Sequence, residues 1–325
     1  MRPCLVLCLL LACAPAGAAR ADDFTVPGWL FPLKPAAPAA SSHVAADPTP
    51  LQVPGSKATF TRAQVTDLFG APDWFPDAHQ PMPEVVAHGR KPGIYACAHC
   101  HLPDGAGRPE NATVAGLPAA YIVDQMKAFA TGARRTAWTG PVFLPADVMA
   151  RTASLVTAAE IADAAAYFSS LPLRHARAEI VETERIPAMR MGSWIHVQSG
   201  DGGQELLGTR LIEVPRSLER HELRDPHTPY VAYVPNGSLA RGRMLAVEGA
   251  AGAPACASCH GAGLRGDALA PPIAGRSPTY LLRQLVAFRT RARNTPAGTP
   301  MQPVVDALTL EDMIAAAAYA AAQPP

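Results

Sequence analysis

Thiol and imidazole side chains recur in this chain at one fixed spacing. Residues 97–101 read Cys-Ala-His-Cys-His, and residues 256–260 read Cys-Ala-Ser-Cys-His. Two cysteines three positions apart lie on one face of a helical turn, so both thiols can reach one ligand. The histidine that follows can place an imidazole nitrogen on a metal ion. The side chains that could carry this chemistry are Cys97, Cys100, His101, Cys256, Cys259 and His260.

Several kinds of site use a Cys-x-x-Cys pair. A dithiol redox site of the thioredoxin type needs a strand–turn–helix context, which neither motif has. A zinc site usually takes its cysteines from neighbouring turns, whereas these pairs lie 159 residues apart. A disulfide between residues three apart explains neither the histidine nor the repetition. Covalent haem attachment explains both, because two thiols bond to two vinyl groups of one porphyrin; the pattern therefore predicts two covalently bound haem c groups.

Both motifs belong to a longer internal repeat. At an offset of 159 residues, the matched pairs are Gly116 with Gly275, Tyr121 with Tyr280, Gln125 with Gln284, Phe129 with Phe288 and Arg134 with Arg293. The first copy then holds seven extra residues, and the offset falls to 152. It now pairs Met149 with Met301, Thr157 with Thr309 and Tyr167 with Tyr319. Two copies of one unit explain the length of the chain.

Met149 and Met301 are the candidates for the second axial ligand of each iron. Each is expected in a loop, eight residues before a threonine that can cap the last helix of its unit. Ligation by histidine and methionine raises the reduction potential and closes the iron to external ligands. A methionine is otherwise a common core residue. The rival ligands are the histidines outside the motifs, His43, His79, His88, His175, His196, His221 and His227. The predicted metal ligands are His101, Met149, His260 and Met301.

Capping and periodicity signals predict helices in each unit. One helix should begin near Pro118 and its counterpart near Pro278. Thr157 and Thr309 open capping boxes, each at the start of the closing helix of its unit. Between the units, short apolar runs predict strands at 180–181, 194–197, 211–214 and 230–234. We therefore expect a mainly α protein with two helical haem units and a β-rich segment between them.

These elements divide the chain into five parts. The predicted parts are a signal peptide at 1–21, a proline- and alanine-rich N-terminal extension at 22–85, the first haem unit at 86–173, a β-rich linker or insertion at 174–238 and the second haem unit at 239–325.

The first residues have the pattern of an export signal. Arg2 provides the positive end, residues 5–12 form a short apolar run, and cleavage is expected after Ala18 or Ala21. Cys13 offers a second interpretation, the lipid-bearing cysteine of a lipoprotein. No later stretch reaches 18 apolar residues, so we expect no membrane-spanning helix. Because haem attachment of this type takes place outside the cytoplasmic membrane, the signal predicts a periplasmic protein.

The overall composition points to no other chemistry. Charge is balanced, with 28 Lys and Arg against 27 Asp and Glu. No basic stripe of the kind that binds nucleic acid runs along the chain. It also contains no nucleotide-binding glycine motif and no nucleophile–base signature.

Together these features resemble class I cytochromes c, and the tandem arrangement resembles bacterial di-haem cytochromes c. The resemblance covers about 88–172 and 238–323. It implies three to five helices around each haem, with Gly89 and Gly242 in the short helix before each motif. It also implies a proline whose backbone supports the haem histidine. The second unit offers Pro271 or Pro272, whereas the first unit departs from the pattern with Ala112-Thr113.

The resemblance implies a periplasmic carrier that passes single electrons between redox protein partners. Two alternatives stay open. One is a haem subunit of a dehydrogenase or oxidase complex, which can be bound to a membrane and would dock through the extension and the central segment. The other is a di-haem peroxidase-like enzyme, which would need an open sixth position on one iron.

Overall fold

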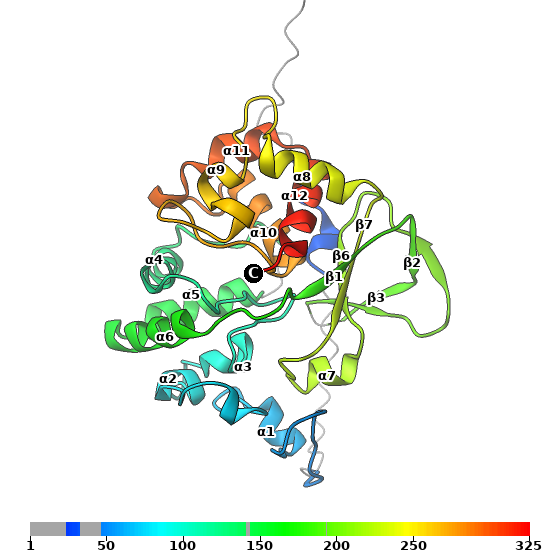
Figure 1. Cartoon of the computed structure of the whole chain (residues 1–325). Coiled ribbons are helices and arrows are strands. Elements are labelled where there is room, and N and C mark those ends of the chain that lie inside the picture. Colours follow the sequence, from blue (N-terminus) through cyan, green and yellow to red (C-terminus); the bar gives the residue numbers. More distant parts are fainter. Residues whose placement is uncertain (1–23, 33–46, 141–143, 193) are drawn as a thin grey trace, which may run out of the picture.

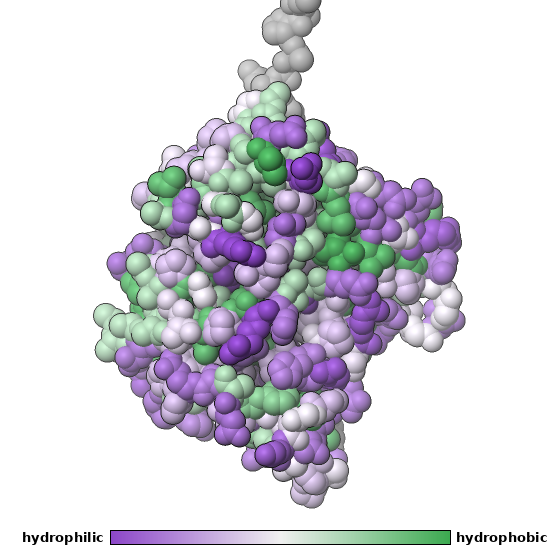
Figure 2. Space-filling view, viewed as in Figure 1, coloured by the Kyte–Doolittle hydropathy of each residue, from purple (hydrophilic) through white to green (hydrophobic). Residues whose placement is uncertain are grey.

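The computed structural model of the chain describes residues 24–32, 47–140, 144–192 and 194–325. The predicted signal peptide at 1–21, both predicted cleavage positions and Cys13 lie outside the described residues. Among the described residues, no helix is long and apolar enough to cross a membrane. Figure 2 shows polar residues over most of one face, with apolar residues gathered in separate small patches.

The first haem unit is a set of short and medium helices (Figure 1). Its helices are α2 (Glu84–Ala87), α3 (Cys97–His101), α4 (Ala119–Ala130), α5 (Pro145–Leu155) and α6 (Ala158–Ser170). Helix α4 packs against both α5 and α6. The Thr157 hydroxyl accepts a hydrogen bond from the Glu160 amide, which confirms the predicted capping box at the start of α6.

The second haem unit repeats this order along the chain. Its α-helices are α8 (Ser238–Val247), α9 (Ala257–His260), α10 (Pro278–Arg289), α11 (Met301–Ala307) and α12 (Leu310–Ala322). Thr309 caps α12 through the amide of Asp312, so the second predicted capping box is also confirmed. The predicted fold class, two helical units joined by a segment with small sheets, is therefore correct.

The two methionine segments differ from the expectation of a loop. Met149 lies in the middle of α5, and Met301 is the first residue of α11. Pro145 stands at the first helical position, where its fixed φ suits the start of α5. Proline has no amide hydrogen, but an amide at this position has no partner within the helix, so nothing is lost. Each methionine is thus presented by a helix rather than by an irregular segment.

Gly89 and Gly242 are both expected in the short helix before each motif, and the structure bears this out for Gly242 only. Gly89 lies beyond the end of α2, has a φ of +64°, and donates its amide hydrogen to Glu84. Gly249 does the same after α8, with a φ of +85° and a bond to Met244. Gly242 instead lies inside α8, where a Cβ would meet the backbone of α12. Gly89 is therefore the counterpart of Gly249, not of Gly242.

The central segment forms small sheets beside the helical units (Figure 1). Its elements are β1 (Ala178–Glu182), β2 (Arg185–Pro187), β3 (Met189–Met191), β4 (His196–Gln198), β5 (Gln204–Leu206), β6 (Ile212–Pro215), α7 (Leu218–Glu222) and β7 (Tyr230–Val234). Strand β7 pairs in parallel with β1 and antiparallel with β6, and β2–β5 and β3–β4 form two antiparallel ribbons.

The described part of the N-terminal extension packs on the rest of the molecule. It contains a 3-10 helix at Gly28–Leu30, α1 (Arg62–Thr66) and a second 3-10 helix at Pro76–Ala78. Trp74 is almost fully buried, and its indole Nε1 donates to the carbonyl of Leu223 at 2.8 Å. Leu30 and Phe31 belong to the same buried apolar cluster as α10 and α12. The extension therefore contacts the central segment and the second unit.

Candidate haem sites

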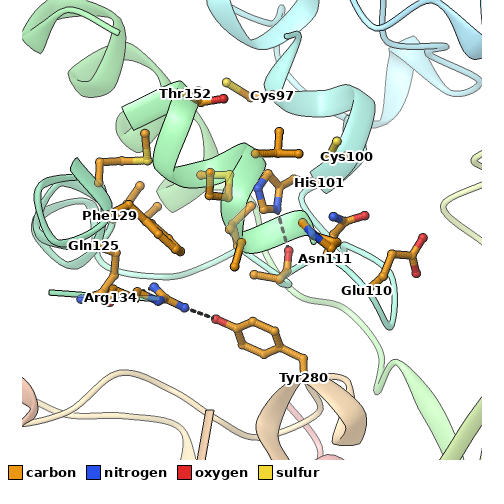
Figure 3. Close-up of a pocket in the computed structure, with 18 of the residues that line it drawn as sticks. Cys97, Cys100, His101, Glu110, Asn111, Gln125, Phe129, Arg134, Thr152 and Tyr280 are labelled. Atoms are coloured by element: carbon orange, nitrogen blue, oxygen red, sulfur yellow. Dashed lines mark hydrogen bonds between the residues drawn. The ribbon is translucent and has the colours of Figure 1, made fainter. Parts of the chain in front are cut away.

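A cavity of about 440 Å³ lies inside the first unit. Cys97, Cys100, His101 and Met149 all line it. Figure 3 shows Cys97 and Cys100 on helix α3 at one end of the cavity, and Arg134 and Tyr280 at the opposite end. The structure thus brings together all four site residues that the sequence predicts for the first unit.

Each haem histidine is oriented by a backbone carbonyl. The Nδ1 atom of His101 lies 2.8 Å from the carbonyl oxygen of Ala112, and Nδ1 of His260 lies 2.8 Å from that of Pro271. The acceptor follows the histidine by 11 residues in both units. With Nδ1 donating to the carbonyl, Nε2 is left for iron. Any residue has a carbonyl, so Ala112 performs the task for which the resemblance implied a proline.

Burial keeps these imidazoles in the form that binds metal. Desolvation lowers the pKa of His101 and of His260, and the hydrogen bond to the carbonyl only partly opposes it. Burial also raises the pKa of Cys97 to about 12, with a further contribution from Cys100. A neutral imidazole and a protonated thiol fit covalent haem attachment better than a reactive thiolate site.

In the second unit, the predicted cysteines and histidine lie at and in α9, and Met301 begins α11. Cys256 and Met301 both pack on one large apolar cluster, built largely from α10 and α12. Helix α9 carries His260, and α11 packs against α10. As haem ligands, these residues and those of the first unit remain predictions.

Three of the rival histidines have other hydrogen-bond partners in the structure. His196 bonds to the carbonyl of Trp29 at 2.8 Å, and His221 bonds to the Tyr230 hydroxyl at 2.9 Å. His79 contacts the Tyr167 hydroxyl at 3.0 Å. His99 lines the cavity, but its Nδ1 atom is turned to the carbonyl of Gly70. His79, His196 and His221 do not line the first cavity, whereas Met149 does.

Other parts of the chain complete the wall of the first cavity. The lining residues from outside the first unit are Phe31, Leu68, Trp194, Arg224, Tyr280, Arg283, Gln284 and Ala287. They come from the extension, the central segment and helix α10. The first site is therefore enclosed by the whole chain and not by its own unit alone.

Two buried arginines form the contact between the units. The backbones of Arg134 and Arg293 pair as an isolated antiparallel bridge. Arg134 donates to Gln125 of its own unit at 2.8 Å and to Tyr280 of the other at 2.7 Å. Arg293 donates to Gln284 of its own unit at 3.1 Å and, like Arg134, also donates to residues of the opposite unit.

The contacts of Arg293 in the first unit complete a near two-fold pattern. Its guanidinium donates to the Tyr121 hydroxyl at 2.8 Å and to the side-chain oxygen of Gln125 at 2.9 Å. Arg134 and Arg293 also stack on Phe129 and Phe288, with the guanidinium 4.6 and 4.5 Å from the ring centres. Residues that mark the sequence repeat are thus the residues of the interface.

Sequence reasoning identified these repeated residues but not their role. Polar and aromatic residues at the same helix positions in both copies are the signal that points to a self-complementary contact. A repeat that serves only its own core would conserve apolar residues instead, so Tyr121 and Gln125 could have suggested an interface.

The residues of the first site fit a haem. Arg134 is buried at the cavity wall, and in the described part of the chain its partners and those of Arg293 are neutral oxygens. Nε of Arg293 is buried without a partner. Buried cations are normally paired with anions. The two propionate carboxylates of a haem have the charge that this end of the cavity lacks.

Comparison with known proteins supports the same assignment. The family model for cytochrome c matches residues 87–172 and 241–321, together more than half of the chain. Two curated relatives are both described as a thiosulfate dehydrogenase electron acceptor. The one from Stutzerimonas stutzeri (strain A1501) is 43% identical over 89 residues, which cover 26% of this chain and 40% of the relative. The one from Thiomonas intermedia (strain K12) is 26% identical over 239 residues, 72% of this chain and 81% of the relative.

Solved structures give similar but looser matches. Thiosulfate dehydrogenase TsdBA from Marichromatium purpuratum is 28% identical with a TM-score of 0.47, over 73% of this chain and 38% of that one. Cytochrome c4 from Acidithiobacillus ferrooxidans is 19% identical with a TM-score of 0.46, over 69% of this chain and 97% of that one. The family assignment rests on the repeated family match: the chain belongs to the cytochrome c family and carries two covalently bound haem c groups.

Proposed function

We propose that this chain is a periplasmic electron carrier whose motifs at 97–101 and 256–260 each hold one haem. Met149 and Met301 are the second axial ligands, and the segment at 1–21 directs export. One observation carries the proposal: in the first unit, Cys97, Cys100 and His101 of α3 and Met149 of α5 line one cavity.

The side chains of the first site have distinct tasks. His101 and Met149 would hold the haem, which would supply one-electron chemistry there. The Ala112 carbonyl fixes the ring of His101, so that ligand reorients little when the charge of the iron changes. Apolar residues of α4, α5 and α10 line the cavity and exclude water from it. Arg134, buried at the cavity wall, would provide positive charge for the propionates.

We further propose that the electron donor is a thiosulfate-oxidising dehydrogenase. The curated relatives carry the description of electron acceptor for such an enzyme, and the Thiomonas relative aligns over most of this chain. Two irons allow one chain to take up two electrons, one at each haem. In this scheme thiosulfate is oxidised on the dehydrogenase and this chain only accepts the electrons, so this chain needs no substrate site of its own.

Carbon monoxide tests the axial ligation. We expect the reduced wild-type protein to show no change in its haem absorption bands, while M149A and M301A each bind one carbon monoxide per chain. M126L is the matched control, because Met126 also lines the first cavity and its loss should leave both irons closed. Binding by the wild-type protein would overturn the carrier proposal and favour a peroxidase-like enzyme.

Rapid mixing tests the donor. The oxidised protein is mixed with purified thiosulfate dehydrogenase and thiosulfate, and haem reduction is followed by absorbance. We expect two electrons per chain, and no reduction when the dehydrogenase is left out. Failure of reduction with an active dehydrogenase would contradict the proposed donor and leave the haem assignment untouched. Stable co-purification of the two proteins would instead assign the chain as a subunit of the complex.

A further inference from the structure

Arg276 is a buried residue of the second unit that contacts both units. Its Nε donates to the carbonyl of Pro272 at 2.7 Å. Its two Nη atoms donate to the carbonyls of Thr113 at 2.8 Å and Ala115 at 3.2 Å, both in the first unit. The residue is 4% exposed. Among the described residues, no carboxylate forms an ion pair with it, so it is a buried cation held by backbone carbonyls.

The carbonyls that Arg276 contacts are equivalent in the two repeats. Thr113 and Pro272 are separated by 159 residues, the offset of the repeat. Each follows directly the residue whose carbonyl holds a haem histidine, Ala112 in the first unit and Pro271 in the second. One guanidinium is therefore bonded one peptide group away from both of the carbonyls that orient the haem histidines.

The position that matches Arg276 in the first unit is Leu117, at the same offset of 159. Arg276 is therefore one cation that serves both sites, whereas an exact repeat would place one arginine in each unit. Burial lowers the pKa of Arg276 to about 10, and the side chain stays protonated at neutral pH.

We propose that Arg276 is a positioning residue shared by the two haem sites and that it raises both reduction potentials through the carbonyls beside it. The proposal rests on the proposed attachment of haem at both motifs. A buried positive charge opposes the extra positive charge of ferric iron. It also weakens the neighbouring peptide carbonyls as acceptors of the histidine proton, which makes the imidazole a poorer donor to ferric iron.

Removing the charge should lower both potentials. For R276M we expect the ratio of reduced to oxidised haem at a fixed potential to fall about two- to tenfold at each haem. A tenfold fall corresponds to about 59 mV for a one-electron couple. R276K keeps the charge and should leave both haems within about twofold of the wild-type ratio. Spectroelectrochemical titration of the purified two-haem protein measures both values.

R289M is the matched control. Arg289 is also buried in the second unit and donates to the backbone carbonyls of Val305 and Asp306, but these lie in the second unit only. R289M should leave the potential of the first haem unchanged. Unchanged potentials in R276M, or a shift confined to the second haem, would overturn the proposal.

The same experiment separates this inference from the proposed function. A wild-type protein with fewer than two haems would contradict the proposed function itself. If R276M does not accumulate with two haems, R276Q takes its place, because it is neutral and keeps amide hydrogens for the carbonyls. Loss of haem in both neutral variants, with a normal R276K, would show a purely structural bridge and refute the effect on potential.

Discussion

The two haem units share one repeat but are stabilised differently. Among the described residues, the apolar core of the first unit is a cluster of eight buried residues beside the cavity, whereas that around the second unit has 24, of which two each come from the extension, the first unit and the central segment. The first unit therefore has the smaller apolar core of its own, and segments outside the repeat complete the wall of its cavity. The second unit is the larger packed body against which the rest of the chain is placed. Equal sequence motifs do not imply equal stability.

Loss of haem attachment should give the largest difference in stability between the two units. C97S/C100S and C256S/C259S should each lose one haem, and the first should lose more stability, because the first unit has the smaller apolar core to hold it together without haem. We expect its free energy of unfolding to fall by at least about 3 kcal/mol, as for other large core cavities. Haem content by absorbance and denaturant unfolding measure both effects. A larger loss for the second pair would reverse the comparison.

Acid should affect the first unit before the second. His221 of the central segment is buried beside Glu110, Arg108 and Arg224, and burial, opposed by Glu110, lowers its pKa to about 4. Unfolded histidine has a pKa of about 6.5, so the unfolded chain binds more protons between pH 4 and 6.5. The free energy of unfolding should therefore fall as the pH drops through this range, on the order of 2 kcal/mol from this residue.

H221Q measures that contribution. The variant should show a flatter dependence of unfolding free energy on pH between 4 and 6.5 than the wild-type protein. H175Q, at an exposed position after the first unit, is the control and should keep the wild-type slope. In the wild-type protein the spectrum of the first haem should change at a higher pH than that of the second. Simultaneous changes would argue that His221 does not stabilise the first unit selectively.

Helix caps should give the smallest effect and an equal one. Thr157 and Thr309 cap α6 and α12 with the same hydrogen bonds. T157A and T309A should each cost about 1 kcal/mol, the usual value for loss of a cap. Thermal unfolding followed by circular dichroism compares them directly. If one substitution costs several times more than the other, the closing helices do not play equivalent roles.

Local signals in the sequence were sufficient for the elements around the motifs. The caps at Thr157 and Thr309, the start of α10 at Pro278 and the strand at 230–234 depend on residues close in the chain, so they could be predicted. Each motif could likewise be assigned to its own helical unit, because the repeat around it is visible in the sequence.

Features that depend on contacts between distant residues could not be predicted in this way. The carbonyl of Ala112 supports His101 without a distinctive side chain, so no residue type marks it. Arg134 and Arg293 were visible as a repeated pair, but their partners lie in the opposite unit. Helix α11 begins at Met301, directly after Pro300. The residues just before Met301 favour a loop as readily as a helix, so this start could not be predicted.

The parallel pairing of β1 and β7 has a consequence for how such a chain can change in evolution. Glu182 at the end of β1 lies opposite Val234 at the end of β7. The Glu182 carboxylate also accepts a hydrogen bond from the amide of Leu239, in the first turn of α8. The chain therefore enters the central segment through β1 and leaves it after β7 at neighbouring points. Loops of this segment that do not line the first cavity can therefore change in length without shifting either haem unit, whereas Trp194 and Arg224 are constrained because they line that cavity.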